Sequence, residues 1–186
     1  MIKKTFIKNL FLVNPKKIKD SRGFFIETYK KKILKKNKIN FDFVQENHSY
    51  SKSKFTLRGL HFQTPPFDQA KLVRVIKGSV VDIALDLRSN SPTYKKYFKV
   101  LLSSKNLKQL LIPTGFAHGF LTMESNTELI YKTSNYYSKK NEVGISWSDP
   151  ELNINWCNKK FKPVLSDKDK ENPKLSEIKT DLNWTK

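Results

Sequence analysis

Short apolar and β-branched runs, separated by turn-forming residues, follow one another from Ile7 to Trp156. Glycine, proline, asparagine and serine mark the interruptions, for example at 77–78 and 90–92. Many short strands with a turn signal after each are typical of an antiparallel sandwich or barrel. The runs therefore predict an all-β fold, with strands at 41–45, 71–75, 80–87, 98–102, 109–112, 119–123 and 128–132.

The clearest alternation of side chains lies between residues 79 and 87. One strand face there carries Val81, Ile83, Leu85 and Leu87, and the opposite face is small or acidic. A period of two indicates a strand whose two faces meet different surroundings. This segment is therefore the most clearly patterned strand of the predicted sheet.

Helical patterns are confined to the two ends of the chain, at about 29–37 and near 166–172. The chain contains no internal repeat, and 186 residues are enough for one domain with a full core. We therefore expect a single domain over 1–186, with a barrel core at about 40–157. The polar segment 158–186 is expected to dock on that barrel.

A formal net charge of +19 is the strongest compositional signal, and it first suggests an anionic partner. The lysines lie throughout the chain and form no stripe with interleaved aromatic residues, as a nucleic-acid surface would. We interpret most of them as a solvated surface and expect no nucleic acid. Only four basic residues are arginine, and two of them, Arg22 and Arg58, fall in the motifs below.

The cellular location is predicted from the short apolar stretches and the single cysteine. Lys3, Lys4 and Lys8 break the only apolar run near the N-terminus, so we expect no signal peptide. No run approaches the ~18 apolar residues of a membrane helix, so we expect no membrane association. Cys157 is the only cysteine, which excludes an internal disulfide and fits a reducing compartment. We therefore expect a cytoplasmic protein.

His61 lies in the stretch 57–63, which we interpret as a strand. One face of that strand would carry Gly59, His61 and Gln63, and the opposite face Arg58, Leu60 and Phe62. On this interpretation Arg58 and His61 point in opposite directions.

His118 ends the pattern Pro-x-Gly-x-x-His at 113–118, which matches half of the cupin signature. The proline and glycine make the turn that delivers the histidine into a barrel. Cupin metal sites usually add His-x-His and a later Glu, because three or four donors must converge on one ion. The corresponding stretch here reads His61-Phe62-Gln63. We therefore expect no metal, and an imidazole without a metal can act as a base.

Seven longer motifs follow one another in order along the chain. They lie at 20–27, 45–49, 56–63, 69–73, 86–93, 113–120 and 147–150. In composition and order they resemble the dTDP-4-dehydrorhamnose 3,5-epimerase family, and the similarity runs from about residue 2 to 184. The resemblance implies a cupin-type antiparallel β jelly roll with a few short helices at the termini. It also implies a homodimer, a dTDP-linked 4-keto-6-deoxyhexose as substrate, and no cofactor.

The implied reaction is an acid–base reaction beside a ketone. Protons on the flanking carbons are acidic because the carbanion delocalises into an enolate, so inversion needs a base, an acid on the other face and charge stabilisation at the oxygen. Matching the family motifs makes His61 the base and Tyr131 the acid. The same match makes Asp169 the residue that orients His61, and Lys71 the residue that stabilises the enolate.

Each of the partners of His61 also has a plain structural interpretation. Asp169 would suit the third position of a helix capped by Ser166, and its neighbour Asp167 is a rival for its place. A lysine in a strand, such as Lys71, is ordinarily a solvated charge. A strand tyrosine, such as Tyr131, is ordinarily core material.

The resemblance also implies substrate-binding positions, which are Arg22, Glu27, Gln45, Asn47, Arg58, Lys71, His118, Tyr137, Glu142 and Lys168. Arg22 and Arg58 suit a diphosphate, because a guanidinium meets phosphate oxygens in a bidentate fork. Tyr137 is expected to stack on the thymine, and His118 to be a second donor to the keto oxygen. His48 lies at a variable motif position and receives no role.

Three functional hypotheses remain open at this point. The first is an isomerase that inverts C3 and C5 of dTDP-4-dehydro-6-deoxy-D-glucose, and a variant of it inverts C3 alone. The second is a non-catalytic cupin module that binds sugars or nucleic acid. The third is a metal-dependent cupin enzyme, which the absence of His-x-His disfavours.

Overall fold

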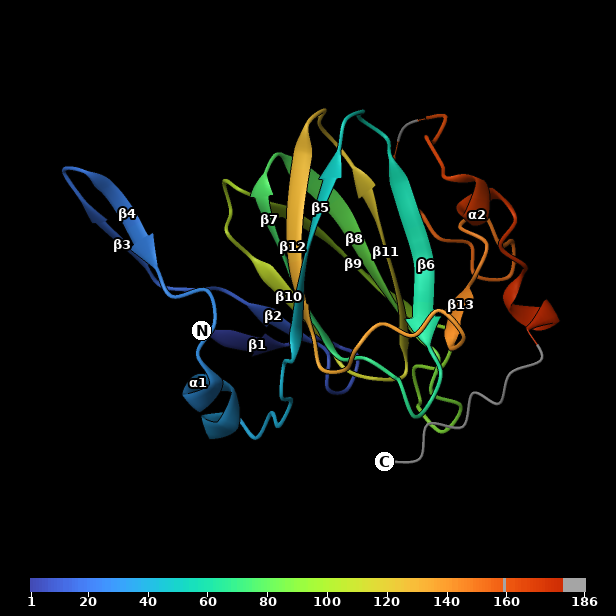
Figure 1. The fold of residues 1–186 in the computed structure, drawn as a ribbon, viewed down its shortest axis with the longest axis horizontal. Helices are drawn as coiled ribbons and strands as arrows, with labels where there is room; N and C mark the ends of the chain where they lie inside the picture. The colour runs from blue at the N-terminus through green and yellow to red at the C-terminus, as the bar shows by residue number, and fades with distance from the viewer. Residues whose placement is uncertain (159, 179–186) are drawn as a thin grey trace.

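The computed structural model describes residues 1–158 and 160–178, and most of its strands form two antiparallel sheets (Figure 1). The first sheet contains, in order, β1 (Ile2–Lys4), β2 (Phe11–Val13), β10 (Gln109–Ile112), β7 (Lys71–Lys77), β12 (Thr127–Thr133) and β5 (Gln45–Ser51). The second contains β13 (Glu142–Gly144), β6 (Leu57–Gln63), β11 (Phe116–Thr122), β8 (Ser79–Asp86) and β9 (Tyr97–Ser103). The predicted all-β jelly roll is confirmed.

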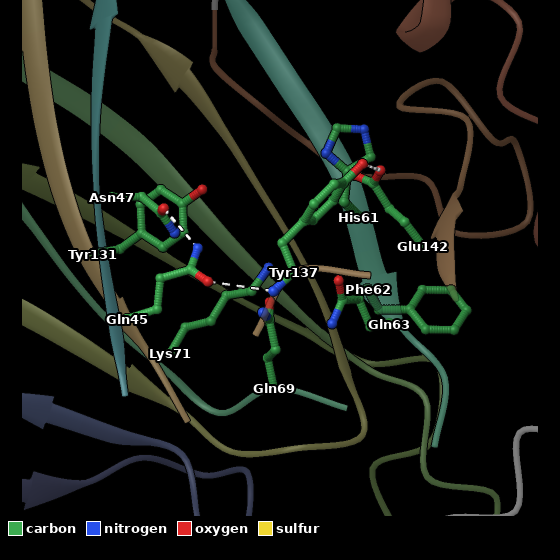
Figure 2. Close-up of a pocket in the computed structure, with 10 residues that line it drawn as sticks. All are labelled: Gln45, Asn47, His61, Phe62, Gln63, Gln69, Lys71, Tyr131, Tyr137 and Glu142. Carbon is green, nitrogen blue, oxygen red and sulfur yellow. Dashed lines mark hydrogen bonds between the residues drawn. The ribbon is translucent and has the colours of Figure 1, made fainter. Parts of the chain in front are cut away.

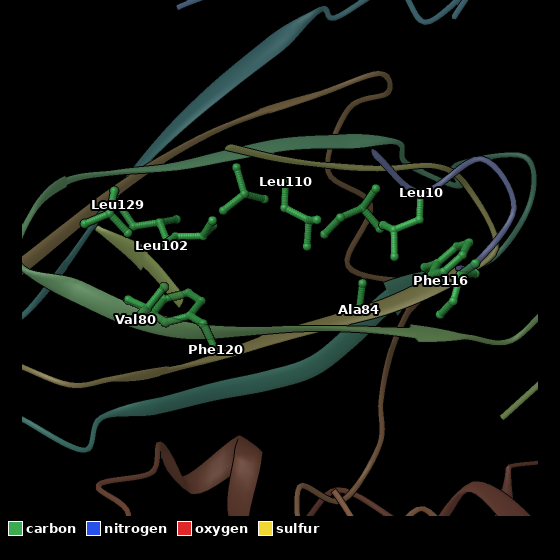
Figure 3. Close-up of a cluster of buried hydrophobic side chains, with 12 residues drawn as sticks. Leu10, Val80, Ala84, Leu102, Leu110, Phe116, Phe120 and Leu129 are labelled. Carbon is green, nitrogen blue, oxygen red and sulfur yellow. The ribbon is translucent and has the colours of Figure 1, made fainter. Parts of the chain in front are cut away.

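A hydrophobic core fills the space between the two sheets. Val80, Ala84 and Phe120 of the five-stranded sheet pack with Leu110 and Leu129 of the six-stranded sheet (Figure 3). Removing each of the larger side chains from water stabilises the fold by roughly 1.5–3 kcal/mol. This core fixes the separation of the sheets. The candidate site lies in the part of the same interior that is lined by polar side chains.

The outer face of the five-stranded sheet carries a second core. Ile83 and Leu85 of β8 pack there against Trp156 and Leu175 from the C-terminal part of the chain. The apolar face of the segment 79–87 is therefore covered by the C-terminal part. Its small or acidic face looks into the sandwich, which explains why an acidic residue of β8 lies in the interior.

The described part of the segment 158–186 lies against that outer face. Phe161, Leu165 and Ile178 pack on the second core, and Val164 forms a bridge with Thr56. Residue 159 and residues 179–186 lie outside the described residues. The contact brings the short helix α2 (Asp167–Lys170) beside β6.

The N-terminal region covers the other sheet and then leaves it. Leu34 of α1 (Lys31–Lys36) and Ile39 pack on Leu72 and Leu111 of the six-stranded sheet. Before α1, the hairpin of β3 (Lys17–Asp20) and β4 (Gly23–Ile26) extends away from the sandwich (Figure 1). The hairpin is therefore far from the core that organises the rest of the chain.

The predicted helices at 29–37 and 166–172 correspond to α1 and α2, and a 3₁₀ turn follows at Leu175–Glu177. None of the helices in the described ranges is long and apolar enough to cross a bilayer. Six of the seven predicted strands lie on observed strands.

The predicted strand at 41–45 is wrong. The strand β5 begins only at Gln45, and residues 41–44 are not in a strand. Phe41 and Phe43 pack beside Leu34 and Ile39 on the outer face of the sheet. An apolar run that covers a sheet from outside has the same composition as a strand, and only the fold separates the two cases.

Candidate active site

Polar side chains from both sheets line a cleft inside the sandwich (Figure 2). Two adjoining cavities of about 290 Å³ and 310 Å³ form it. Both cavities are lined by His61, Lys71, Tyr131, Tyr137 and Glu142. The cleft therefore collects candidate residues that are up to 124 positions apart in the sequence, from Gln45 to Asp169.

His61 forms a pair with Asp169 on the wall made by β6. Its Nε2 lies 2.6 Å from Asp169 Oδ1, and the side chains are 25% and 4% exposed. Burial acts to raise the pKa of Asp169, but the hydrogen bond and charge of His61 outweigh it and hold the pKa below 3.8. The carboxylate therefore stays charged and can stabilise an imidazolium.

Asp169 is held in place by the start of α2. Ser166 is the N-cap of this helix, and its hydroxyl accepts a hydrogen bond from the Asp169 N–H at 3.1 Å. The same hydroxyl donates to Asp169 Oδ2 at 3.0 Å, while Oδ1 faces His61. The capping position and the pairing with His61 therefore coexist. The rival Asp167 is exposed and pairs with Lys170.

Arg58 and His61 face the same cavity, which corrects the predicted alternation of β6. The pairing of β6 with β11 shifts register between His118 and Phe120, at the point where Gly59 has a φ of +103°. The irregularity adds one residue between the two inward-facing side chains. Leu57, Leu60 and Phe62 pack in the outer core instead.

Arg58 is held at the rim of this wall by the neighbouring strand β5. Its Nη2 donates to the carbonyl of Tyr50 at 2.9 Å, and its Nε donates to Ser51 Oγ at 3.4 Å. The guanidinium retains further donors beside the cavity, which suits an anionic group.

Tyr131 and Asn47 come from β12 and β5, on the wall opposite β6 (Figure 2). Burial and the charge of Glu142 raise the pKa of Tyr131 above its ordinary value of 10.0, against smaller opposing effects of Arg58 and Asn47. The phenol therefore keeps its proton at neutral pH. A protonated phenol facing a paired imidazole across a cleft can deliver a proton where the imidazole removes one.

Lys71 begins β7, which pairs with β12 on the same wall as Tyr131, and it lines both cavities (Figure 2). Burial lowers its pKa to about 8, while the negative charges of Glu142 and Asp82 act in the opposite direction. The ammonium remains the main form at neutral pH. It supplies the positive charge that an enolate oxygen between the walls would need.

Tyr137, Glu142 and Lys168 form a chain of contacts beside His61. The Tyr137 hydroxyl donates to Glu142 Oε2 at 2.7 Å, and Lys168 forms an ion pair with the same carboxylate. These bonds lower the pKa of Glu142 although its burial acts to raise it. Gln45 accepts from the backbone N–H of Tyr137 at 3.3 Å and donates to Asn47 at 2.8 Å. This series of contacts therefore joins the two walls at one end of the cleft.

Arg22 and Glu27 are not brought to this cleft. Arg22 is on the projecting hairpin, where its side chain is 88% exposed and pairs with Asp20 at 2.7 Å. Glu27 follows the hairpin and pairs with Lys30. Within one chain, eleven of the thirteen predicted site residues surround the cleft and these two lie elsewhere.

Two residues without a predicted role support the residues that line the cleft. Gln63 donates to the carbonyls of Phe67 and Tyr136 and accepts from the Ser138 N–H, so it ties together two loops beside Tyr137. Asp82 is fully buried beside His118. An acidic residue in the middle of a largely apolar strand was the signal for Asp82, and an inward-facing amide beside His61 was the signal for Gln63.

One family of known proteins matches most of this chain. A sequence model of the dTDP-4-dehydrorhamnose 3,5-epimerase family matches residues 4–177. The chain belongs to this family. The dTDP-4-dehydrorhamnose 3,5-epimerase of Shigella flexneri is 47% identical over 169 residues, which are 89% of this chain and 91% of that protein.

Solved structures of epimerases agree with the assignment. The crystal structure of the Bacillus anthracis dTDP-4-dehydrorhamnose 3,5-epimerase, with TDP and PPi bound, has a TM-score of 0.91 at 43% identity and covers 94% of this chain and 99% of that one. The Legionella pneumophila 3,5-epimerase, in complex with dTDP-4-keto-L-rhamnose, has a TM-score of 0.94 at 38% identity and covers 100% and 99%. The epimerase fold therefore extends over the whole described chain.

Proposed function

We propose that this chain is an isomerase that inverts C3 and C5 of dTDP-4-dehydro-6-deoxy-D-glucose and forms dTDP-4-dehydro-L-rhamnose. The observation that carries the proposal is the opposition of His61 and Tyr131 across one cleft, with Lys71 lining the same cavity (Figure 2). Inversion at a carbon needs proton removal from one face and proton delivery to the other. A base and an acid on opposite walls meet that need.

The reaction begins with proton transfer from the carbon beside the C4 ketone to His61. The C–H bond pair moves into the ketone, and the resulting enolate oxygen is stabilised by the Lys71 ammonium. Asp169 stabilises the imidazolium that forms, as the carboxylate does in other histidine–aspartate pairs. Tyr131 then gives its proton to the opposite face of the carbon. One proton leaves and one arrives, so no redox step is needed.

The remaining polar residues of the cleft suit the nucleotide part of the substrate. The guanidinium of Arg58 meets a diphosphate, and the ring of Tyr137 offers a face for the thymine. Gln45, Asn47, Glu142 and Lys168 line the same two cavities, where they can fix the sugar and the nucleotide between them. His118 is the second donor beside the ketone. We expect a dTDP-sugar as the partner, with neither nucleic acid nor a membrane.

The projecting hairpin supports a homodimer. Ile18, Phe24 and Phe25 are 54%, 54% and 63% exposed on it, which is unusual for large apolar side chains in a separate chain. Arg22 and Glu27, on and beside this hairpin, have the chemistry for substrate binding but lie away from their own cleft. We infer that the hairpin docks on a second copy and delivers both residues to the partner's cleft.

A cytoplasmic location is part of the same proposal. Cys157 is the only cysteine, so the fold depends on no internal disulfide. That cysteine usage fits a reducing compartment.

The proposal is tested by incubating the protein with the keto sugar nucleotide in heavy water and locating deuterium by NMR. Deuterium at both C3 and C5, with inversion at both carbons, is the expected result. Deuterium at C3 alone would show that the protein inverts only C3. Exchange at neither carbon, together with salt-dependent nucleic-acid binding, would favour the non-catalytic binding module.

A further inference from the structure

Asp82 is a fully buried carboxylate at the inner face of β8. The neighbouring inward residues Val80 and Ala84 belong to the hydrophobic core between the sheets (Figure 3). A buried carboxylate costs several kcal/mol unless a partner satisfies it. An acidic residue kept among apolar neighbours therefore requires a specific interaction that offsets this cost.

The partner of Asp82 is His118, on the adjacent strand β11. The register pairs Asp82 with Phe120, so His118 is its diagonal neighbour on the same face. His118 Nε2 lies 3.0 Å from one carboxylate oxygen and 3.1 Å from the other. The histidine is 8% exposed and lines the cleft, whereas the carboxylate beneath it has no exposure.

The contact decides which nitrogen of His118 remains for a ligand. A carboxylate only accepts hydrogen bonds, so Nε2 must carry its proton and donate to Asp82. Nδ1 is then the only ring nitrogen left for the substrate, and it donates to the keto oxygen when it carries a proton as well, in the doubly protonated ring whose charge Asp82 balances. Without Asp82 the ring would be able to rotate and exchange the roles of its two nitrogens.

Asp82 also acts on the second group at the ketone end of the cleft. Its negative charge opposes the effect of burial on Lys71 and so favours the ammonium. His118 and Lys71 line the same cavity with His61, which is the register partner of His118 across β6 and β11. One buried carboxylate therefore faces both groups that would meet the enolate oxygen.

We propose that Asp82 is a positioning residue for the epimerisation, which holds the His118 ring through Nε2 and reserves Nδ1 for the oxygen end of the substrate. The inference rests on the proposed function and adds to it a residue that never touches the substrate. Because C3 and C5 flank the same C4 oxygen, loss of Asp82 slows proton exchange at both carbons by the same factor.

The test compares Asp82→Asn with Asp86→Asn. Asp86 is on the same strand, also fully buried, and holds Arg88 and Ser91 instead of a histidine. Asp82→Asn should lower kcat by about 10- to 100-fold, less than the ~100- to 1000-fold typical of removing an oxyanion donor outright. KM should stay within about threefold, because the nucleotide contacts remain. The ratio of exchange at C3 and C5 should not change. Asp86→Asn should show no selective loss of kcat.

A double-mutant cycle shows whether Asp82 acts through His118. In a His118→Gln background, Asp82→Asn should cost much less than in the wild type, because the two effects are not additive for residues that act together. Full additivity, or an unchanged kcat for Asp82→Asn alone, overturns the proposal.

A spectroscopic measurement keeps the proposal testable if the variants do not fold. The chain has three histidines, so ¹⁵N-histidine labelling of the wild type gives resolvable ring signals. We expect His118 with a proton on Nε2, and a neutral ring with its proton on Nδ1 would contradict the inference. This measurement needs no turnover. If the wild type exchanges the proton at neither C3 nor C5, the proposed function is wrong. The NMR signals still decide which nitrogen of His118 carries a proton.

Discussion

At the scale of single residues, the cleft keeps the phenol of Tyr131 protonated and brings the pKa of the Lys71 ammonium close to neutral pH. The pKa of Tyr131 is raised, so its phenol holds the proton that it must deliver. The pKa of Lys71 is lowered to about 8, so its ammonium is the main form only below that pH. Both shifts arise chiefly from burial, which favours the neutral form of each group.

Replacing Tyr131 by phenylalanine should separate proton removal from inversion. His61 can still remove a proton, but delivery to the opposite face loses its donor, so we expect inverted product to fall by about 100-fold. Deuterium should still enter the substrate with its configuration retained. NMR of the sugar in heavy water measures both quantities, and undiminished inversion would exclude Tyr131 as the acid.

The activity should depend on the protonation of Lys71. Above pH 8 the ammonium loses its proton, and we expect kcat/KM to fall by about tenfold per pH unit. Arginine stays charged at all accessible pH values, so Lys71→Arg should move this alkaline limb upward even if the maximum rate is lower. An alkaline limb that is identical in both proteins would assign it to another group.

The same shift has a consequence for stability. The pKa of Lys71 is about 8 in the folded state against 10.5 for an ordinary lysine, so between these values the unfolded state binds more protons. The contribution of Lys71 to the free energy of unfolding is therefore most unfavourable below pH 8 and improves as the pH rises toward 10.5. Lys71→Met should be more stable than the wild type by about 1 kcal/mol at pH 7, with a smaller difference at pH 10. Urea unfolding at the two pH values measures it, and a less stable variant at pH 7 would contradict the burial argument.

At the scale of elements, the start of α2 connects the C-terminal segment to the chemistry. Ser166 caps the helix and bonds one oxygen of Asp169 while the other oxygen faces His61. A four-residue helix is thus enough to hold a carboxylate in one orientation, because the cap and the imidazole bind different oxygens.

Ser166→Ala should lower activity more than stability. Loss of an N-cap costs about 1 kcal/mol, and Asp169 loses the bond that fixes its second oxygen. We expect kcat to fall by about tenfold, the equivalent of 1.4 kcal/mol at the transition state. Asp167→Asn is the matched control, since that side chain is exposed and points away, and its kcat should equal that of the wild type. Equal effects of the two substitutions would rule out a role for the cap.

The sequence could predict the elements whose patterns depend only on neighbours along the chain. The alternation at 79–87 predicted a strand, but not that its apolar face points outward, because the covering C-terminal segment is about 70 residues away. The irregularity at Gly59 reversed the predicted side of Arg58, since one extra residue in a strand moves every later side chain to the other face. The contact between His118 and Asp82 depends on the register of β8 and β11, which no motif records.

At the scale of the whole molecule, the sandwich supplies two rigid walls and the hairpin reaches beyond them. The cores on both outer faces hold the C-terminal segment and α1 against the sheets, whereas the hairpin extends away from the sandwich (Figure 1). The expected homodimer would therefore combine a complete cleft from one chain with a hairpin from the other.

A mixture of two inactive variants should regain activity if the hairpin serves the partner's cleft. Arg22→Ala removes the hairpin contact and His61→Ala removes the base, so each homodimer lacks one part in both clefts. If subunits exchange at random, about half of the dimers are mixed, and one of the two clefts in each mixed dimer is competent. About one cleft in four should therefore be active. The measurement is epimerisation before and after co-refolding of the two variants, with light scattering to confirm the dimer. Absence of recovery in a confirmed mixed dimer would place Arg22 outside the partner's cleft.

His61 is the proposed base that removes the proton beside the ketone, and proton exchange in heavy water measures that step without requiring the full reaction. The wild type and His61→Ala are incubated with the keto sugar nucleotide, and the C3 and C5 proton signals are followed by NMR. We expect loss of both signals with the wild type and retention of both with His61→Ala. Full exchange at both carbons with His61→Ala would contradict it.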